Sequence, residues 1–324
     1  MSKRLLLISQ RAEDKAFAAE VALEAGLDLL LAEDPIKGAE LVDSQEPAVV
    51  FVDVTTEAQF VAFETALQEK VGLFSDKINL NAIHFLSSSD LTEVPFLIQS
   101  PIFGHFVFRN YGDVKVSGPH YGRIVKSSQA ERAFDLTVLL KPGAKIQIVK
   151  LQSTSQKQEA VEAIKSYLEA AKFQTRMATS IANAVDELLM NAMFDAPIDE
   201  MGKTIYSQTP RSTVIALTGK HEVEMKVGFD GDYIAITAVD KFGSLDKVKL
   251  MKHIAKIYTD EEYKVKSSVA GAGLGLATVF HSGGSFYFVS ESRTRTEVTV
   301  FFKRTDSYRE FKDQFRFIST QFYF

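Results

Sequence analysis

A carboxylate and a carboxamide lie four residues apart in the segment Val185–Ala192. Glu187 and Asn191 therefore share one face of a predicted helix. Together they could meet one Mg²⁺–phosphate group, with the Asn191 oxygen as a hard ligand and Glu187 orienting a water or a hydroxyl. The alternative interpretation is an ordinary polar, solvated helix face.

A second candidate is Asp240, which follows the apolar run Ile234–Val239 and comes just before Gly243. A carboxylate at the end of a strand could accept a hydrogen bond from an exocyclic amine, which would select adenine over guanine. The alternative is an Asp that only helps to form the turn.

Three alternating glycines, Gly271, Gly273 and Gly275, precede Leu276 and an apolar helix start. Such a loop lets backbone N–H groups approach phosphates at a helix N-terminus. The loop does not follow a predicted strand, as a dinucleotide-binding fingerprint would require. A flexible hinge is the alternative interpretation.

The order of these three segments, over about 145–303, resembles the GHKL ATP-binding fold of gyrase, Hsp90, histidine kinases and anti-sigma kinases. The resemblance implies ATP and Mg²⁺ as cofactors, Glu187 as general base and Asn191 as the metal ligand. It implies that Asp240 binds the adenine amine, that residues 244–270 form a mobile lid and that Thr296 contacts the adenine side. The nucleotide-binding set expected in this way is Asn191, Asp240, Gly243, Gly271, Gly273, Gly275, Leu276 and Thr296.

One departure from the family pattern concerns the loop after Asp240, which usually reads Asp-x-Gly-x-Gly. Phe242 and Ser244 stand where glycines are expected, with Gly243 between them. Either the loop is built differently around Gly243, or adenine binding is weakened.

Missing features indicate which group of GHKL proteins the chain resembles most. The residues before 145 show no long heptad hairpin with a phosphoacceptor His, and we expect none of the large further domains of gyrase- and Hsp90-type proteins. The helix motif is closest to the anti-sigma serine-kinase group. The resemblance therefore implies a serine/threonine kinase switch with a regulatory protein partner, such as a sigma factor, an anti-sigma antagonist or a response-pathway protein. A non-catalytic nucleotide-gated scaffold and a stand-alone ATPase are the alternatives, and a homodimer is also compatible.

The first half alternates short apolar strands with helical patterns, which favours a doubly wound parallel sheet. It resembles a response-regulator receiver domain over about 1–125, with Asp53 ending a strand where a phosphoacceptor would lie. Ser9 and Gln10 occupy the place of the expected acidic pair, so Mg²⁺ would have few ligands there. We therefore expect a pseudo-receiver used for protein contact. Asp53 could also simply cap the next turn. Asp34, which precedes Pro35, could likewise be a turn-forming residue.

The elements of the second half must position the three chemical segments. After a linker at 141–143, the patterns predict helices over 157–171 and 176–192 and strands at about 145–151, 212–217, 223–229, 233–239, 285–290 and 297–303. Residues 134–140 read as helical. The predicted fold is α/β: a doubly wound receiver-like domain (1–140) followed by a GHKL α/β sandwich (141–324). The aromatic C-terminal tail, with Tyr308, Phe311 and Phe315 at helical spacing, reads as core or as a docking surface.

Composition excludes several classes of function. The 324 residues contain no Cys, which removes disulfides, zinc ribbons and thiol nucleophiles. Residues 1–140 hold 12 basic and 20 acidic side chains, a balance of −8, and the remainder holds 25 and 22, a balance of +3. An acidic front half is a poor nucleic-acid surface. No apolar run approaches the ~18 residues of a membrane span, and the N-terminal apolar run is too short for a signal peptide, so we expect a cytoplasmic protein.

Overall fold

The computed structural model describes residues 3–72, 79–89, 93–129, 136–251, 285–313 and 321–323. The chain divides into two compact units, residues 1–139 and residues 140–315, and the C-terminal strand β11 (Gln321–Tyr323) groups with the first. Among the described residues, no helix is both long and apolar enough to cross a membrane.

The first unit is a parallel sheet with helices on both of its faces. Its strands are β1 (Arg4–Ile8), β2 (Asp28–Ala32), β3 (Val49–Asp53), β4 (Ile83–Ser87) and β5 (His105–Phe108). Its helices are α1 (Ala12–Ala25), α2 (Pro35–Gln45), α3 (Glu57–Lys70), α4 (Pro95–Gln99) and α5 (Val114–Ser128), with short 3₁₀ turns η1 (Leu80–Ala82) and η3 (Leu136–Leu139).

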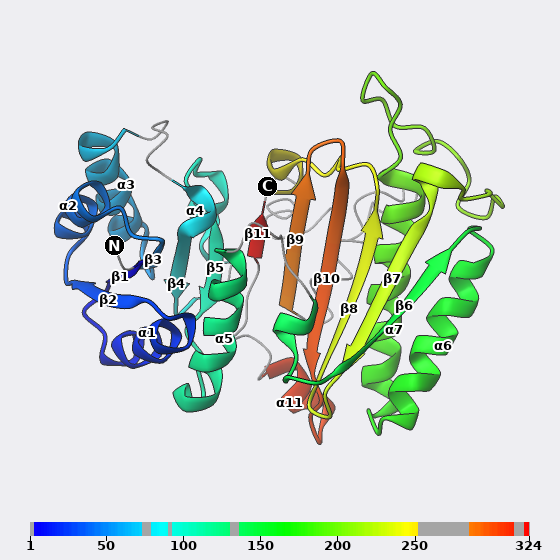
Figure 1. The fold of residues 1–324 in the computed structure, drawn as a ribbon, viewed down its shortest axis with the longest axis horizontal. Helices are drawn as coiled ribbons and strands as arrows, with labels where there is room; N and C mark the ends of the chain where they lie inside the picture. The colour runs from blue at the N-terminus through cyan, green and yellow to red at the C-terminus, as the bar shows by residue number, and fades with distance from the viewer. Residues whose placement is uncertain are drawn as a thin grey trace. The chain divides into compact units, whose positions relative to one another are not determined.

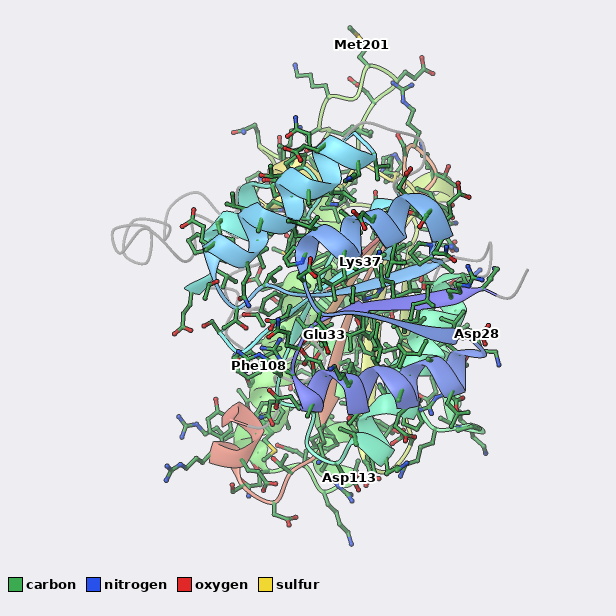
Figure 2. All side chains as sticks on the ribbon, turned by 90° about the vertical axis from the view of Figure 1, so that its left-hand side faces the viewer. Asp28, Glu33, Lys37, Phe108, Asp113 and Met201 are labelled. Atoms are coloured by element: carbon green, nitrogen blue, oxygen red, sulfur yellow. The ribbon has the colours of Figure 1, made fainter. Side chains whose placement is uncertain are left out.

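The strand order β2-β1-β3-β4-β5, parallel throughout, is that of receiver-like doubly wound folds. Figure 2 shows α1 and α5 on one face of this sheet and α2 and α3 on the other. Because both faces are covered, β1 and β3 read as nearly continuous apolar runs, with Leu5 and Phe51 fully buried.

Helix ends in the first unit follow from local chemistry. The Asp34 carboxylate accepts a hydrogen bond from the Lys37 backbone N–H at 2.8 Å and so caps α2, the turn role considered for it. Thr56 begins α3 with a reciprocal capping box to Gln59.

The second unit is an antiparallel sheet with helices laid against it. Its strands β6 (Lys145–Leu151), β7 (Val223–Phe229), β8 (Tyr233–Asp240), β9 (Ser285–Glu291) and β10 (Arg295–Lys303) lie side by side in the order β9-β10-β8-β7-β6. Its helices are α6 (Gln156–Ala170), α7 (Thr175–Met190) and α11 (Tyr308–Asp313), with a π-helical turn η4 (Asn191–Asp195) and a 3₁₀ turn η5 (Gly219–His221).

Helices α6 and α7 pack together on one face of this sheet (Figure 1). The buried face of α7 carries small and branched apolar residues, among them Ile181, Val185 and Leu189. The predicted fold class, a receiver-like parallel sheet followed by an antiparallel α/β sandwich, is confirmed.

Two local predictions need correction. The segment predicted as a strand at 212–217 forms none, apart from one isolated bridge between Ala216 and Ser153. It belongs to the long irregular connection from α7 to β7, where turn-forming residues hold the backbone in bends. The helix expected over 134–140 is only the 3₁₀ turn η3 in its described part.

The aromatic tail begins as part of the core. Phe311 is fully buried and stacks on Phe302 of β10, with 5.7 Å between ring centroids. The Tyr323 ring lies 4.6 Å from the His105 ring. The tail segment around Phe315 lies outside the described residues.

Candidate nucleotide site

The carboxylate–carboxamide pair lies where helix α7 changes its winding. The Asn191 backbone N–H donates to the Glu187 carbonyl, so the two residues are one helical turn apart, and both are half-buried. From Asn191 onward the helix continues as one π turn, closed by the Ala196 N–H donating to the Asn191 carbonyl at 2.9 Å. Single π turns inside or at the end of α-helices are frequent at functional sites.

The electrostatic surroundings of Glu187 favour its neutral form. Burial raises the pKa of the Glu187 carboxyl and neighbouring Asp186 raises it further, while Lys157 and Arg211 act in the opposite direction. Both cations are held in ion pairs, Lys157 with Asp186 and Arg211 with Asp195. A carboxyl with a raised pKa is a better proton acceptor near neutral pH than an ordinary glutamate.

Asp240 lies at the end of β8, and its side chain is almost completely enclosed. Only 5% of the residue is exposed, and Oδ1 accepts a hydrogen bond from the Phe242 N–H at 2.9 Å. Burial raises the pKa of this carboxyl to about 6, partly offset by the Phe242 and Gly243 N–H groups and the Thr296 hydroxyl. Thr296 on β10 is the direct cross-strand neighbour of Asp240.

The loop after Asp240 is built around Gly243. This is the first of the two interpretations given above for the altered glycine pattern. Gly243 has φ +57°, and a Cβ there would lie 1.9 Å from the Glu291 carbonyl oxygen of the β9–β10 turn. The same turn donates the Arg293 N–H to the Gly243 carbonyl at 3.2 Å. Phe242 is buried, and its ring lies 5.1 Å from that of His221. The large side chain at this position therefore packs in the core.

A hydrogen bond joins this loop to the π turn. The Ser244 hydroxyl donates to the Ala196 carbonyl at 2.7 Å, so the segment after Asp240 is tied to the residue after η4. The end of α7 and the π turn both contact β8. Five predicted site residues thus come from neighbouring elements: Glu187, Asn191, Asp240, Gly243 and Thr296. The other four, Gly271, Gly273, Gly275 and Leu276, lie outside the described residues, as does the predicted lid from residue 252 onward.

The first unit holds a separate buried charge cluster at the carboxyl edge of its sheet. The Arg109 guanidinium, directly after β5, lies 2.7 Å from the Asp14 carboxylate and 2.8 Å from that of Asp53. It also donates to the hydroxyls of Thr55 and Ser88. Figure 2 shows the edge at which these strands end, marked by Glu33 and Phe108.

The charge of Arg109 compensates both carboxylates. Burial alone would raise the pKa of Asp53, but the charge and hydrogen bond of Arg109 bring it below its usual value. Asp53 also accepts from the Thr55 hydroxyl at 2.8 Å, which is the turn-capping role considered for it. Within the described ranges, no group of three or more acidic or His side chains is placed to hold a metal ion.

Comparison with known proteins assigns no family to this chain. No family model matches the chain, and no curated protein matches it. Among solved structures, a chain of "The crystal structure of SiaB-SiaC complex from Pseudomonas aeruginosa" aligns at 14% identity with a TM-score of 0.31. The alignment covers 47% of this chain and 88% of that chain.

Sequence reasoning missed Asp14, Arg109, Arg211 and the π turn. Asp14 and Arg109 are 95 positions apart, and no local pattern links them. One available signal was that Arg109 directly follows the apolar run Phe106–Phe108. Such a run is typical of a buried strand, and strand ends in a parallel sheet share one edge.

Proposed function

We propose that the second unit binds Mg-ATP in the manner of GHKL proteins and works as a phosphoryl-transfer switch on a protein partner. The observation that carries the proposal is the Ser244–Ala196 hydrogen bond, which couples the loop after the buried Asp240 to the turn that begins at Asn191. The amine-recognising end and the phosphate end of one nucleotide site would then be built by adjacent elements.

The residues present fit such a ligand. The Asp240 carboxylate has about four acceptor positions, and the Phe242 N–H, the Gly243 N–H and the Thr296 hydroxyl do not use all of them, which leaves acceptor capacity for an exocyclic amine. Thr296 beside it offers a hydroxyl to the same ring edge. Asn191 would hold Mg²⁺ through its amide oxygen, and the ion would supply charge neutralisation for the phosphates.

Within this proposal, Glu187 accepts the proton from the attacking hydroxyl of a partner Ser or Thr. Its half-buried position and raised pKa suit that role, because a carboxylate with a raised pKa accepts the proton of a hydroxyl more readily than an ordinary glutamate does. The same position could instead orient a water, which would make the protein an ATPase without a partner substrate.

A nucleotide-gated scaffold is the second candidate function. It is favoured by the Arg109 cluster, because a receiver-like unit whose carboxylates are neutralised internally is suited to contact a partner rather than to accept a phosphoryl group. In that case ATP would bind without transfer.

Isothermal titration of the full chain with ATP, with and without Mg²⁺, tests nucleotide binding. We expect saturable binding that Asp240→Asn weakens at least tenfold. Asp232→Asn is the matched control, since Asp232 is exposed just before the opposite end of β8. Absence of heat with ATP under both conditions would reject the proposal.

Transfer is tested with radiolabelled ATP and proteins that copurify with the chain from its native cell. A kinase labels a partner, and Glu187→Ala abolishes the label while ATP still binds. Glu200→Ala, in the exposed loop after the π turn, is the control that keeps activity. Binding without label supports the scaffold, and phosphate release without a partner supports the ATPase.

A further inference from the structure

Strand β6 has one edge with no strand beside it in the described part of the chain. It pairs with β7 through seven consecutive residues and ends the strand order on that side. An unpaired edge presents a row of backbone N–H and C=O groups that can hydrogen-bond another extended chain.

The side chains of this edge strand are unusually exposed for their type. Ile148 is 58% exposed and Val149 is 40% exposed, although both are strong strand formers. Lys145 and Lys150 flank them and are also exposed, and β6 itself contains no acidic residue. Two carboxylates of the neighbouring segment face Lys150, and each has another cation as partner. Glu224, opposite Lys150 in the register, lies 3.8 Å from Lys226, and Glu222 pairs with Lys241 at 2.9 Å.

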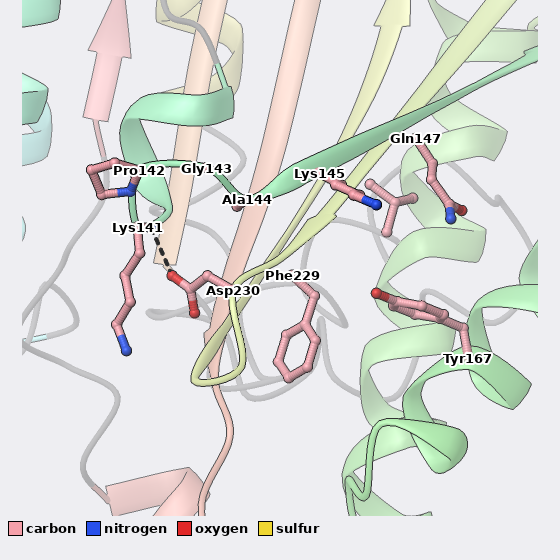
Figure 3. Close-up of a pocket in the computed structure, with 10 residues that line it drawn as sticks. Lys141, Pro142, Gly143, Ala144, Lys145, Gln147, Tyr167, Phe229 and Asp230 are labelled. Atoms are coloured by element: carbon pink, nitrogen blue, oxygen red, sulfur yellow. Dashed lines mark hydrogen bonds between the residues drawn. The ribbon is translucent and has the colours of Figure 1, made fainter.

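A pocket of about 530 Å³ adjoins the same strand at the end of the sheet away from Asp240. Figure 3 shows Lys145 and Gln147 of β6 and Tyr167 of α6 around it, with Phe229 on the next strand. The Tyr167 and Phe229 rings meet edge-on, 6.5 Å apart. Asp230 also lines the pocket, but its carboxylate is occupied by the backbone N–H groups of Lys141, Asp232 and Tyr233. The pocket therefore combines an aromatic floor with the Lys145 cation on its β6 side.

We propose that this edge and pocket bind an extended acidic segment of a protein partner, which adds to the sheet as a strand beside β6. An apolar side chain of the segment enters the pocket over Phe229, and acidic side chains lie against Lys145 and Lys150. This deepens the proposed function by giving the protein partner a docking surface, and it requires no bound nucleotide.

Charge argues for an acidic partner over a second copy of this chain. Two β6 strands paired with each other would bring four lysines into one ribbon without a carboxylate of their own. Lysines on an edge strand disfavour such self-pairing. An acidic segment meets the same lysines with the opposite charge.

The test is selection of random 12-residue peptides displayed against the full chain without nucleotide. We expect enrichment of peptides that carry an acidic residue on each face of the strand and an apolar residue for the pocket, because Lys145 and Lys150 lie on opposite faces of the sheet. Hydrogen exchange with one selected synthetic peptide should slow at amides of residues 145–151, because strand addition uses backbone hydrogen bonds whereas a purely ionic contact would not.

Two variants separate the charges from the pocket. Lys145→Glu combined with Lys150→Glu should weaken the selected peptide at least tenfold, and Gln147→Trp should weaken it by filling the pocket while retaining both lysines. Lys203→Glu, on the exposed α7–β7 connection, is the matched control and should bind like the wild type. Circular dichroism confirms that each variant folds.

Three results would overturn the proposal: no enriched acidic peptides, equal binding by the double charge variant, or unchanged exchange in β6. A dimer in analytical ultracentrifugation that Ile148→Asp disperses would assign the edge to a second copy instead. All these measurements omit ATP, so they can fail while nucleotide binding succeeds, and the reverse.

Discussion

At the scale of single residues, the buried carboxyl of Asp240 lowers the stability of the folded chain at neutral pH. Its pKa is about 6 in the folded chain against an ordinary 3.8, so the folded state binds more protons than the unfolded state between these values. The ionised side chain therefore destabilises the fold above pH 6, by roughly 3 kcal/mol at most. This penalty fades as the pH falls toward 4.

Asp240→Asn should consequently raise the free energy of unfolding at pH 7.5 while it weakens ATP binding. The gain should shrink toward zero near pH 4, which denaturant titration at both pH values measures. ATP affinity of the wild type should fall as the pH drops below 6, because the protonated carboxyl loses an acceptor. A variant that is less stable than the wild type at pH 7.5 would contradict this account.

Arg109 stabilises the fold, in contrast to Asp240, because its guanidinium compensates the charge of two buried carboxylates. Its side chain is 1% exposed, between the fully buried Asp14 and the 9% exposed Asp53. Arg109→Met leaves both carboxylates without their cation and should destabilise the first unit by about 3–5 kcal/mol. Thermal unfolding measures the loss.

Arg11→Met is the control for this prediction. Arg11 also pairs with Asp53, at 3.1 Å, but its side chain is 41% exposed. Such a surface pair is worth about 1 kcal/mol or less. Equal effects of the two substitutions would show that the Arg109 network is not what holds this edge of the sheet together.

The site residues differ in how far the sequence could predict them. Glu187 and Asn191 share a helix, and Asp240 follows a strand, so local spacing is enough to place them. The Arg109 cluster depends on segments from α1, β3 and β5 meeting in space, which no window of the sequence displays. Long-range ion pairs are therefore the part of such a site that remains hidden until the fold is known.

At the scale of elements, the β8 loop depends on one close approach. Gly243→Ala would add a Cβ against the Glu291 carbonyl in addition to the strain of a positive φ. Gly219 has nearly the same φ, +62°, but open space around it. We expect Gly219→Ala to cost about 1 kcal/mol and Gly243→Ala about 3 kcal/mol or more, with loss of ATP binding. Denaturant unfolding compares them, and equal costs would show that conformation alone explains the requirement for glycine.

Helix α5 is an element that the local sequence pattern does not indicate. Its interior contains Gly118, Pro119 and Gly122, which are poor helix formers, and the sequence patterns indicated no helix there. The glycines are needed because α1 lies so close: a Cβ at Gly118 would lie 2.3 Å from the Glu20 Cβ, and one at Gly122 2.6 Å from the Glu24 Cβ. Tertiary packing has overridden local propensity. The strands β1, β3 and β8, by contrast, were predictable because each buries a continuous apolar run.

At the scale of the whole molecule, the two units treat their buried carboxylates differently. The unit with the acidic balance neutralises its central carboxylates with its own arginine, while the other unit keeps Asp240 and Glu187 without such direct compensation. Uncompensated buried carboxyls are costly, and they are retained most often where they serve a ligand or a reaction. We therefore expect the nucleotide chemistry proposed above to belong to the second unit.

This division predicts two separable unfolding transitions in calorimetry of the full chain, since each unit has its own sheet and its own buried residues. Mg-ATP at about 100 times its Kd should stabilise only the second unit, by about 2.7 kcal/mol, which corresponds to roughly 5–10 °C in its Tm. Arg109→Met should lower only the other transition. Applying both together should leave each shift unchanged, because each perturbation acts on a different transition. A single transition that responds equally to ATP and to Arg109→Met would show instead that the chain unfolds as one cooperative body. Nucleotide binding would then also stabilise the receiver-like unit.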